Sequence, residues 1–266
     1  MRIGWVHDFN LQTRPGGAQV QDFLLLQGAP EKAEIVECLP GKIDQTCDFY
    51  IVARCLTFSD EEQEWLLRAR FAKLEPDYAE TGNCRRANQF IAKAQKLFFL
   101  SPLHWEEFCR RHWLESGDFR QKLCLMPSPL ALPEPSNGAR KGIVWLGEWQ
   151  PHKGYDLVME WAERQKQEVH FYGIGMDSMK DSQFCKFKGF VPWDKVPELL
   201  GQYETWIHFP RQPEPFPRLM AEALLCGCEA KVAGRFGFES YGLGIREMLQ
   251  FCLSAPKLFW DEVEKI

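Results

Sequence analysis

Short apolar runs alternate with longer amphipathic segments along the 266 residues of this chain. In the first half, segments with helical spacing separate the apolar runs. Ser59, followed by three acidic residues, indicates the start of a further helix. The runs that indicate buried strands cover residues 2–7, 34–39, 48–53, 71–74, 96–100 and 121–126, and the helical segments cover 19–26, 81–94 and 103–113. Strands that alternate with helices predict a parallel sheet.

The second half repeats this alternation. Its expected strands are 142–146, 168–172, 187–191, 206–209 and 229–233, and its expected helices are 155–166, 194–203, 219–226 and one or two within 241–265. Residues 127–142 carry four prolines and no periodicity, which is typical of a linker. We therefore predict an α/β chain of two Rossmann-like domains, 1–130 and 142–266, joined by a linker at 131–141. Packing of the terminal helix back on the first domain is compatible with this prediction.

Composition narrows the class of protein. Hydrophobic residues make up 45% of the chain and charged residues 26%, as in soluble globular proteins. The net charge of -5 argues against a dedicated nucleic-acid binder. The ten cysteines form no C-x-x-C pair and no zinc-type spacing, which favours free thiols in a reducing compartment. No run is long enough for a transmembrane segment and the start does not resemble a signal peptide, so we expect a cytoplasmic protein.

Residues 206–227 contain a strand, a proline-rich turn and a helix that ends at Gly227. Two carboxylates bracket the helix start: Glu214 lies in the turn and Glu222 in the helix. A helix N-terminus that follows a strand is a common place for an α/β fold to hold phosphate or sugar. Either carboxylate alone is equally well explained as an ordinary surface charge.

A similar arrangement opens the chain, where Gly16 and Gly17 end a polar loop between the first strand and the first helix. Glycine lets a ligand approach backbone N–H groups closely. A plain tight turn is the equal alternative for this pair.

The order of motifs in the second half resembles that of retaining GT-B glycosyltransferases, most closely glycosyltransferase family 4. The motifs are Gly147, Lys153-Gly154, Gly173-x-Gly175, Gly189-Phe190-Val191 and an E-x7-E pattern from Glu214 to Glu222. The resemblance covers nearly all of residues 140–232 and, more thinly, residues 1–30. It implies two Rossmann-like domains that face each other across a cleft, with a shortened N-terminal domain.

The resemblance also implies how a nucleoside diphosphate sugar, with UDP or GDP as the nucleotide, would be held. Glu222 would bind the ribose hydroxyls, Glu214 would contact the donor sugar near the reacting carbon, and Lys153 would neutralise the diphosphate. No metal or other cofactor would be required. The catalytic residues expected on this basis are Glu214 and Lys153, and the donor-binding residues are Gly16, Gly17, Lys153, Gly173, Arg211, Phe216, Arg218, Leu219 and Glu222.

Three positions depart from the family pattern. Glu148 stands where the family has a diphosphate-binding arginine, and Arg211 and Arg218 are the candidates to replace that cation. Pro217 replaces a glycine, which removes one backbone N–H but suits the first position of a helix. The histidine that the family places in the cleft has no clear match. The adjacent pair His7 and Asp8, at the end of the first strand, is a candidate to face the cleft, and a structural pair is the alternative.

Three functions follow from these residues. The first is a retaining glycosyltransferase whose acceptor is a glycan, a lipid-linked sugar, a protein, a small molecule or a modified nucleic acid. The second is a catalytically degenerate protein that binds nucleotide sugars without turnover, which the three departures favour. The third is a sugar-nucleotide epimerase on the same fold, which the E-x7-E order disfavours.

Overall fold

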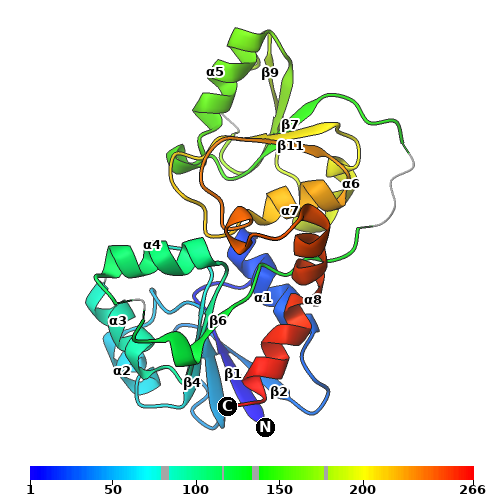
Figure 1. The fold of residues 1–266 in the computed structure, drawn as a ribbon. Helices are drawn as coiled ribbons and strands as arrows, with labels where there is room; N and C mark the ends of the chain where they lie inside the picture. The colour runs from blue at the N-terminus through cyan, green and yellow to red at the C-terminus, as the bar shows by residue number, and fades with distance from the viewer. Residues whose placement is uncertain (79–83, 116, 134–137, 177–178) are drawn as a thin grey trace. The chain divides into compact units, whose positions relative to one another are not determined.

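The computed structural model describes residues 1–78, 84–115, 117–133, 138–176 and 179–266. The chain forms two compact units, one made of Met1–Leu130 with Ser240–Ile266 and one made of Ala131–Glu239 (Figure 1). Residues 240–266, which the sequence pattern assigned to the second domain with a terminal helix that could pack back on the first, are part of the first unit. The expected linker at 131–141 and the start of the expected helix at 81–94 lie partly outside the described residues.

Six parallel strands form the sheet of the first unit, in the order β2-β1-β3-β4-β5-β6. They are β1 (Arg2–Val6), β2 (Glu34–Cys38), β3 (Phe49–Val52), β4 (Phe71–Glu75), β5 (Lys96–Phe99) and β6 (Leu123–Leu125). The apolar runs arise because helices cover both faces of such a sheet. In β3, Phe49 and Ile51 pack into one core, while Tyr50 and Val52 pack into the other.

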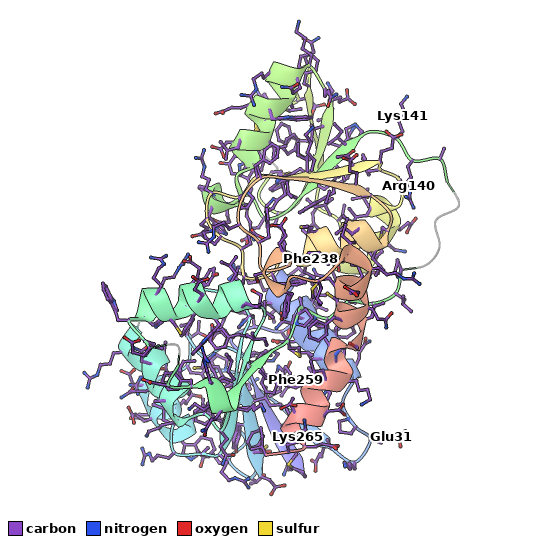
Figure 2. All side chains as sticks on the ribbon, in the orientation of Figure 1. Glu31, Arg140, Lys141, Phe238, Phe259 and Lys265 are labelled. Atoms are coloured by element: carbon purple, nitrogen blue, oxygen red, sulfur yellow. The ribbon has the colours of Figure 1, made fainter. Side chains whose placement is uncertain are left out.

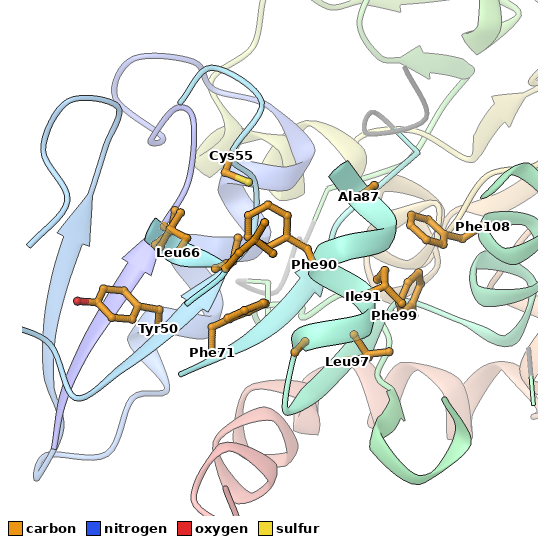
Figure 3. Close-up of a cluster of buried hydrophobic side chains, with 14 of the residues drawn as sticks. Tyr50, Cys55, Leu66, Phe71, Ala87, Phe90, Ile91, Leu97, Phe99 and Phe108 are labelled. Carbon is orange, nitrogen blue, oxygen red and sulfur yellow. The ribbon is translucent and has the colours of Figure 1, made fainter. Parts of the chain in front are cut away.

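Helices on the two faces complete these cores. One core gathers side chains of α2, α3 and α4 around Phe71, Phe90 and Phe99 (Figure 3). The other lies under α1 and α8. The bounds are α1 (Gly17–Gln27), α2 (Asp60–Leu66), α3 (Cys84–Lys93), α4 (Pro102–His112) and α8 (Ile245–Val263). The helix start predicted at Ser59 is confirmed, since Ser59 and Glu62 cap each other's backbone N–H groups.

The terminal helix α8 is held to the first unit by aromatic packing. Phe259 lies on α8 (Figure 2). Its ring is 5.7 Å from that of Trp5 and 4.6 Å from that of Phe98. The indole nitrogen of the buried Trp260 donates a 2.7 Å hydrogen bond to the carbonyl of Leu25. Burying one large aromatic side chain stabilises a fold by about 2–3 kcal/mol, so these contacts explain why α8 belongs to this unit. None of the described helices is both long and apolar enough to cross a membrane.

Five parallel strands form the sheet of the second unit, in the order β11-β10-β7-β8-β9. They are β7 (Ile143–Leu146), β8 (Val169–Tyr172), β9 (Cys185–Gly189), β10 (Thr205–His208) and β11 (Glu229–Val232), with helices α5 (Tyr155–Gln165), α6 (Val196–Leu200) and α7 (Arg218–Leu225). The third of these strands along the chain, β9, begins and ends two residues earlier than the expected 187–191. Gly189 takes a left-handed φ of 84° and ends the strand there.

Candidate active site

Loops that follow β7, β10 and β11 bring the main site residues together in the second unit. These strands are neighbours in a parallel sheet, so their carboxyl ends lie at one edge. Lys153 ends a short 3-10 turn after β7, His208 is the last residue of β10, and Glu214 lies in the loop that follows β10. The backbone of Glu214 is bonded to the loop after β11 on both sides, through the carbonyl of Arg235 and the N–H of Gly237.

Glu214 accepts two hydrogen bonds on one oxygen. The Lys153 ammonium lies 2.8 Å from Glu214 Oε1, and His208 Nε2 lies 3.2 Å from the same atom. A carboxylate only accepts, so both nitrogens donate. No hydrogen bond from the described part of the chain reaches Glu214 Oε2. The described residues therefore hold one oxygen of this carboxylate and make no hydrogen bond to the other.

The charges around Glu214 keep it ionised. Its exposed fraction is 7%, and burial by itself would raise the pKa of a carboxyl group. The Lys153 ammonium and the hydrogen bond from His208 outweigh this effect, so the pKa of Glu214 lies well below its usual value. The structure thus brings Glu214 and Lys153, the two expected catalytic residues, together in one ion pair, and their catalytic role remains a prediction.

The loops after β7 and β10 are tied together by backbone as well as side-chain contacts. The N–H of Arg211 donates to the carbonyl of His152 at 2.9 Å, and the Arg211 guanidinium pairs with Asp156. Gly154 has a φ of 64°, and a Cβ added there would lie 1.8 Å from the carbonyl oxygen of Phe209. Only glycine permits this approach, which places Lys153 beside Glu214.

Helix α7 carries the second carboxylate of the site. Glu222 pairs with Arg218 one turn earlier, and their side chains are 12% and 13% exposed. Burial raises the pKa of Glu222, and the Arg218 charge offsets part of that rise. Glu222 Oε2 is buried and has no hydrogen-bond partner within the described ranges. An acceptor atom in this state is suited to a hydroxyl donor from a ligand.

The start of α7 differs from the expectation for Pro217. Pro217 is the residue before the helix, not its first residue, and α7 begins at Arg218. Its φ of -77° still suits the chain entering the helix, while its missing N–H removes one donor from this end. Phe216 is buried against Phe238, with ring centroids 5.8 Å apart, and Leu219 is half-buried.

Gly173 and Glu148 lie on the neighbouring strand ends. A Cβ on Gly173 would lie 1.6 Å from the carbonyl oxygen of Gly147, so Gly173 is needed for the close approach of the two loops. Glu148 is exposed and accepts a 3.3 Å hydrogen bond from the side chain of Gln150. Arg211 and Arg218, the expected replacements for the missing arginine, already pair with Asp156 and Glu222 as described above.

Gly16 and Gly17 lie in the first unit, at the start of α1. Gly16 precedes the helix and Gly17 is its first residue. A Cβ on Gly16 would meet the Gln19 side chain at 2.6 Å, whereas the space beside Gly17 is open within 4 Å. Only the space beside Gly17 is thus open among these two positions, and a donor-binding role of this pair remains a prediction.

His7 and Asp8 are held by other residues of the first unit and not by each other. His7 Nδ1 lies 3.3 Å from Asp22 and Nε2 lies 3.0 Å from Glu37. Asp8 Oδ1 accepts hydrogen bonds from the backbone and the hydroxyl of Thr57 at 2.9 and 3.0 Å. Both residues therefore have structural partners within the first unit, and a role in a cleft remains a prediction.

His104 in the first unit is fully buried and neutral. Its Nδ1 accepts from the N–H of Leu100 at 3.2 Å and its Nε2 donates to the carbonyl of Asp77 at 3.2 Å. Burial lowers the pKa of His104 from its ordinary 6.5 to about 3. Because the unfolded chain takes up a proton below the ordinary pKa and the folded chain does not, stability should fall as pH drops from 6.5 towards 3.

We expect His104→Gln to remove part of this acid sensitivity. The measurement is the free energy of unfolding in urea at several pH values across that range. An unchanged slope in His104→Gln would contradict this assignment.

His208 is the site residue that sequence reasoning missed. It was counted as part of the apolar run of residues 206–209. The available signal was an imidazole in an otherwise apolar strand, at the strand's carboxyl end. Within the described ranges, no group of three or more His, Cys, Asp or Glu side chains is arranged to hold a metal ion.

Comparison with known proteins supports the fold. No family model matches this sequence, and no curated protein sequence matches it significantly. HepE from Anabaena in complex with UDP-glucose has a TM-score of 0.67 at 14% identity, covering 98% of this chain and 95% of its own. AviGT4, a glycosyltransferase involved in avilamycin A biosynthesis, has a TM-score of 0.66 at 10% identity, covering 100% and 97%.

A third solved structure, an α-glucosyltransferase in complex with UDP and DNA containing a HMU base, has a TM-score of 0.59 at 11% identity, covering 100% and 93%. Two of these three neighbours are named as glycosyltransferases, and the third was solved with UDP-glucose. The chain has the α/β fold of two parallel-sheet, Rossmann-like domains that matches them, which confirms the predicted fold class.

Proposed function

We propose that this protein is a glycosyltransferase that transfers a sugar from a nucleoside diphosphate sugar to an acceptor with retention of anomeric configuration. The observation that carries the proposal is the Lys153–Glu214 ion pair at the carboxyl edge of the second sheet. It combines a cation for a diphosphate with an ionised carboxylate whose second oxygen is available to a sugar hydroxyl.

The remaining groups of the second unit fit the same ligand. Glu222 Oε2, buried and without a partner in the described structure, is suited to accept from a ribose hydroxyl. The N-terminus of α7, with Phe216 and Leu219 beside it, adds a positive dipole for a phosphate group. Lys153 would stabilise the charge that develops on the departing diphosphate. UDP-hexoses are the first donors to test, because HepE was solved with UDP-glucose.

A second candidate function is nucleotide-sugar binding without turnover. The observation that favours it is the pairing of Arg211 with Asp156 and of Arg218 with Glu222, since neither arginine is then a free replacement for the cation lost at Glu148. Fewer positive charges at the diphosphate would lower catalysis more than binding.

A panel of UDP- and GDP-sugars separates the two functions. If the protein is a transferase, one nucleotide sugar should raise its melting temperature. Incubation with that nucleotide sugar should release the nucleoside diphosphate, and the rate of release should increase when a suitable acceptor is added. Saturation at a hundredfold excess over Kd stabilises a fold by about 2.7 kcal/mol, so binding alone is detectable. A raised melting temperature without release of nucleoside diphosphate, whichever acceptor is added, supports the second candidate, nucleotide-sugar binding without turnover. No stabilisation by any sugar would contradict both candidates.

A further inference from the structure

The buried imidazole of His208 makes one hydrogen bond within the described structure, and that bond is to Glu214. The side chain is on β10, an interior strand of the sheet, and is 5% exposed. The Trp206 ring lies 5.2 Å from the imidazole and the Phe236 ring 6.4 Å. Burying a polar ring among apolar groups is costly unless it makes a hydrogen bond. The described residues provide one such bond, from Nε2 to Glu214 Oε1, and Nδ1 is buried without a partner.

The two donors to Glu214 Oε1 differ in their freedom to move. Lys153 is 32% exposed and carries its charge at the end of a flexible chain. His208 is fixed by a strand that is paired on both sides and by the aromatic rings beside it. An incoming diphosphate carries more negative charge than one carboxylate, so it would draw the Lys153 ammonium towards itself. Glu214 Oε1 would then retain His208 as its remaining donor.

We infer that His208 is a positioning residue that holds Glu214 Oε1 and keeps Oε2 directed at the donor sugar while Lys153 moves to the diphosphate. The inference rests on the proposed function. It requires the tautomer with hydrogen on Nε2, because the carboxylate accepts and cannot donate. The step breaks no covalent bond and transfers no proton, since one hydrogen bond of Lys153 is exchanged for another.

Two variants of His208 test the inference by turnover. His208→Leu removes the donor at similar volume, and His208→Gln keeps an N–H group near the position of Nε2. We expect His208→Leu to lower kcat for the nucleotide sugar by on the order of 10²-fold, with a smaller change in KM, because a misplaced catalytic group affects the reaction more than binding. His208→Gln should recover most of the activity. His170→Gln, at a histidine on β8 outside the site, is the control and should match the wild type.

An NMR measurement tests the same inference without turnover. In the wild-type protein, ¹⁵N shifts should show hydrogen on His208 Nε2, and the pKa of the Glu214 carboxyl, followed by ¹³C, should rise in His208→Leu. A wild type that binds no nucleotide sugar refutes the proposed function, and the NMR result then decides alone whether His208 holds Glu214. Wild-type kcat in His208→Leu, an unprotonated Nε2, or an unchanged Glu214 pKa in His208→Leu overturns the inference.

Discussion

Glu214→Gln is expected to lower turnover of the nucleotide sugar by on the order of 10²–10³-fold while the fold is retained. Lys153 and His208 both donate to Oε1, so the glutamine amide should place its oxygen there and its NH₂ group at the position of Oε2. The atom available to the sugar then changes from an acceptor to a donor, and the negative charge is lost. The steady-state rate of nucleoside diphosphate release measures the effect.

The matched control is Glu204→Gln, which makes the same change at an exposed carboxylate of the second unit. Circular dichroism and urea unfolding of both variants separate lost chemistry from lost structure. Removing one partner of a buried ion pair costs about 3–5 kcal/mol, and the partial exposure of Lys153 should keep the cost below this range. Wild-type turnover in Glu214→Gln would remove Glu214 from the mechanism.

Gly154→Ala is expected to lower the free energy of unfolding by about 3 kcal/mol or more. The left-handed φ of 64° alone costs an L-residue about 1–2 kcal/mol. The new Cβ would also lie 1.8 Å from the carbonyl oxygen of Phe209, so the loop after β7 or the end of β10 must shift. That shift moves Lys153 relative to Glu214, so turnover should fall together with stability. Urea unfolding and the turnover assay measure the two effects.

Gly189→Ala provides the comparison for Gly154→Ala. Gly189 is in the same unit and has a φ of 84°, but a Cβ there would meet nothing within 4 Å. This variant should lose only the conformational part, about 1–2 kcal/mol. Equal destabilisation by the two substitutions would show that contact with Phe209 is not what requires glycine at position 154.

Local pattern was sufficient to predict most of the fold. The strand expected at 96–100 is found as Lys96–Phe99, and the helix expected at 155–166 is found as Tyr155–Gln165. A run of consecutive apolar residues identifies a strand buried on both faces, and helical spacing identifies the segments that cover it. The class of the fold follows from the alternation of these two local signals.

Local pattern was less informative at the ends of elements and in the loops. The shift of β9 and the place of Pro217 before α7 both depend on backbone angles that residue type alone does not specify. The order of motifs, by contrast, was sufficient to propose Glu214, Lys153 and Glu222 as site residues from the sequence alone.

By itself, then, the sequence determined the order of strands and helices, the α/β class and three charged candidates for a donor site. Only the tertiary structure decided that α8 belongs to the first unit, where Trp260 bonds to a carbonyl 235 positions away. It also decided that Lys153, 61 positions before Glu214, and His208 both donate hydrogen bonds to the same oxygen of Glu214. The physical reason is that periodicity records only which face of an element is buried, whereas these contacts depend on the order of strands in the sheet and on the close approach of loops that Gly154 permits.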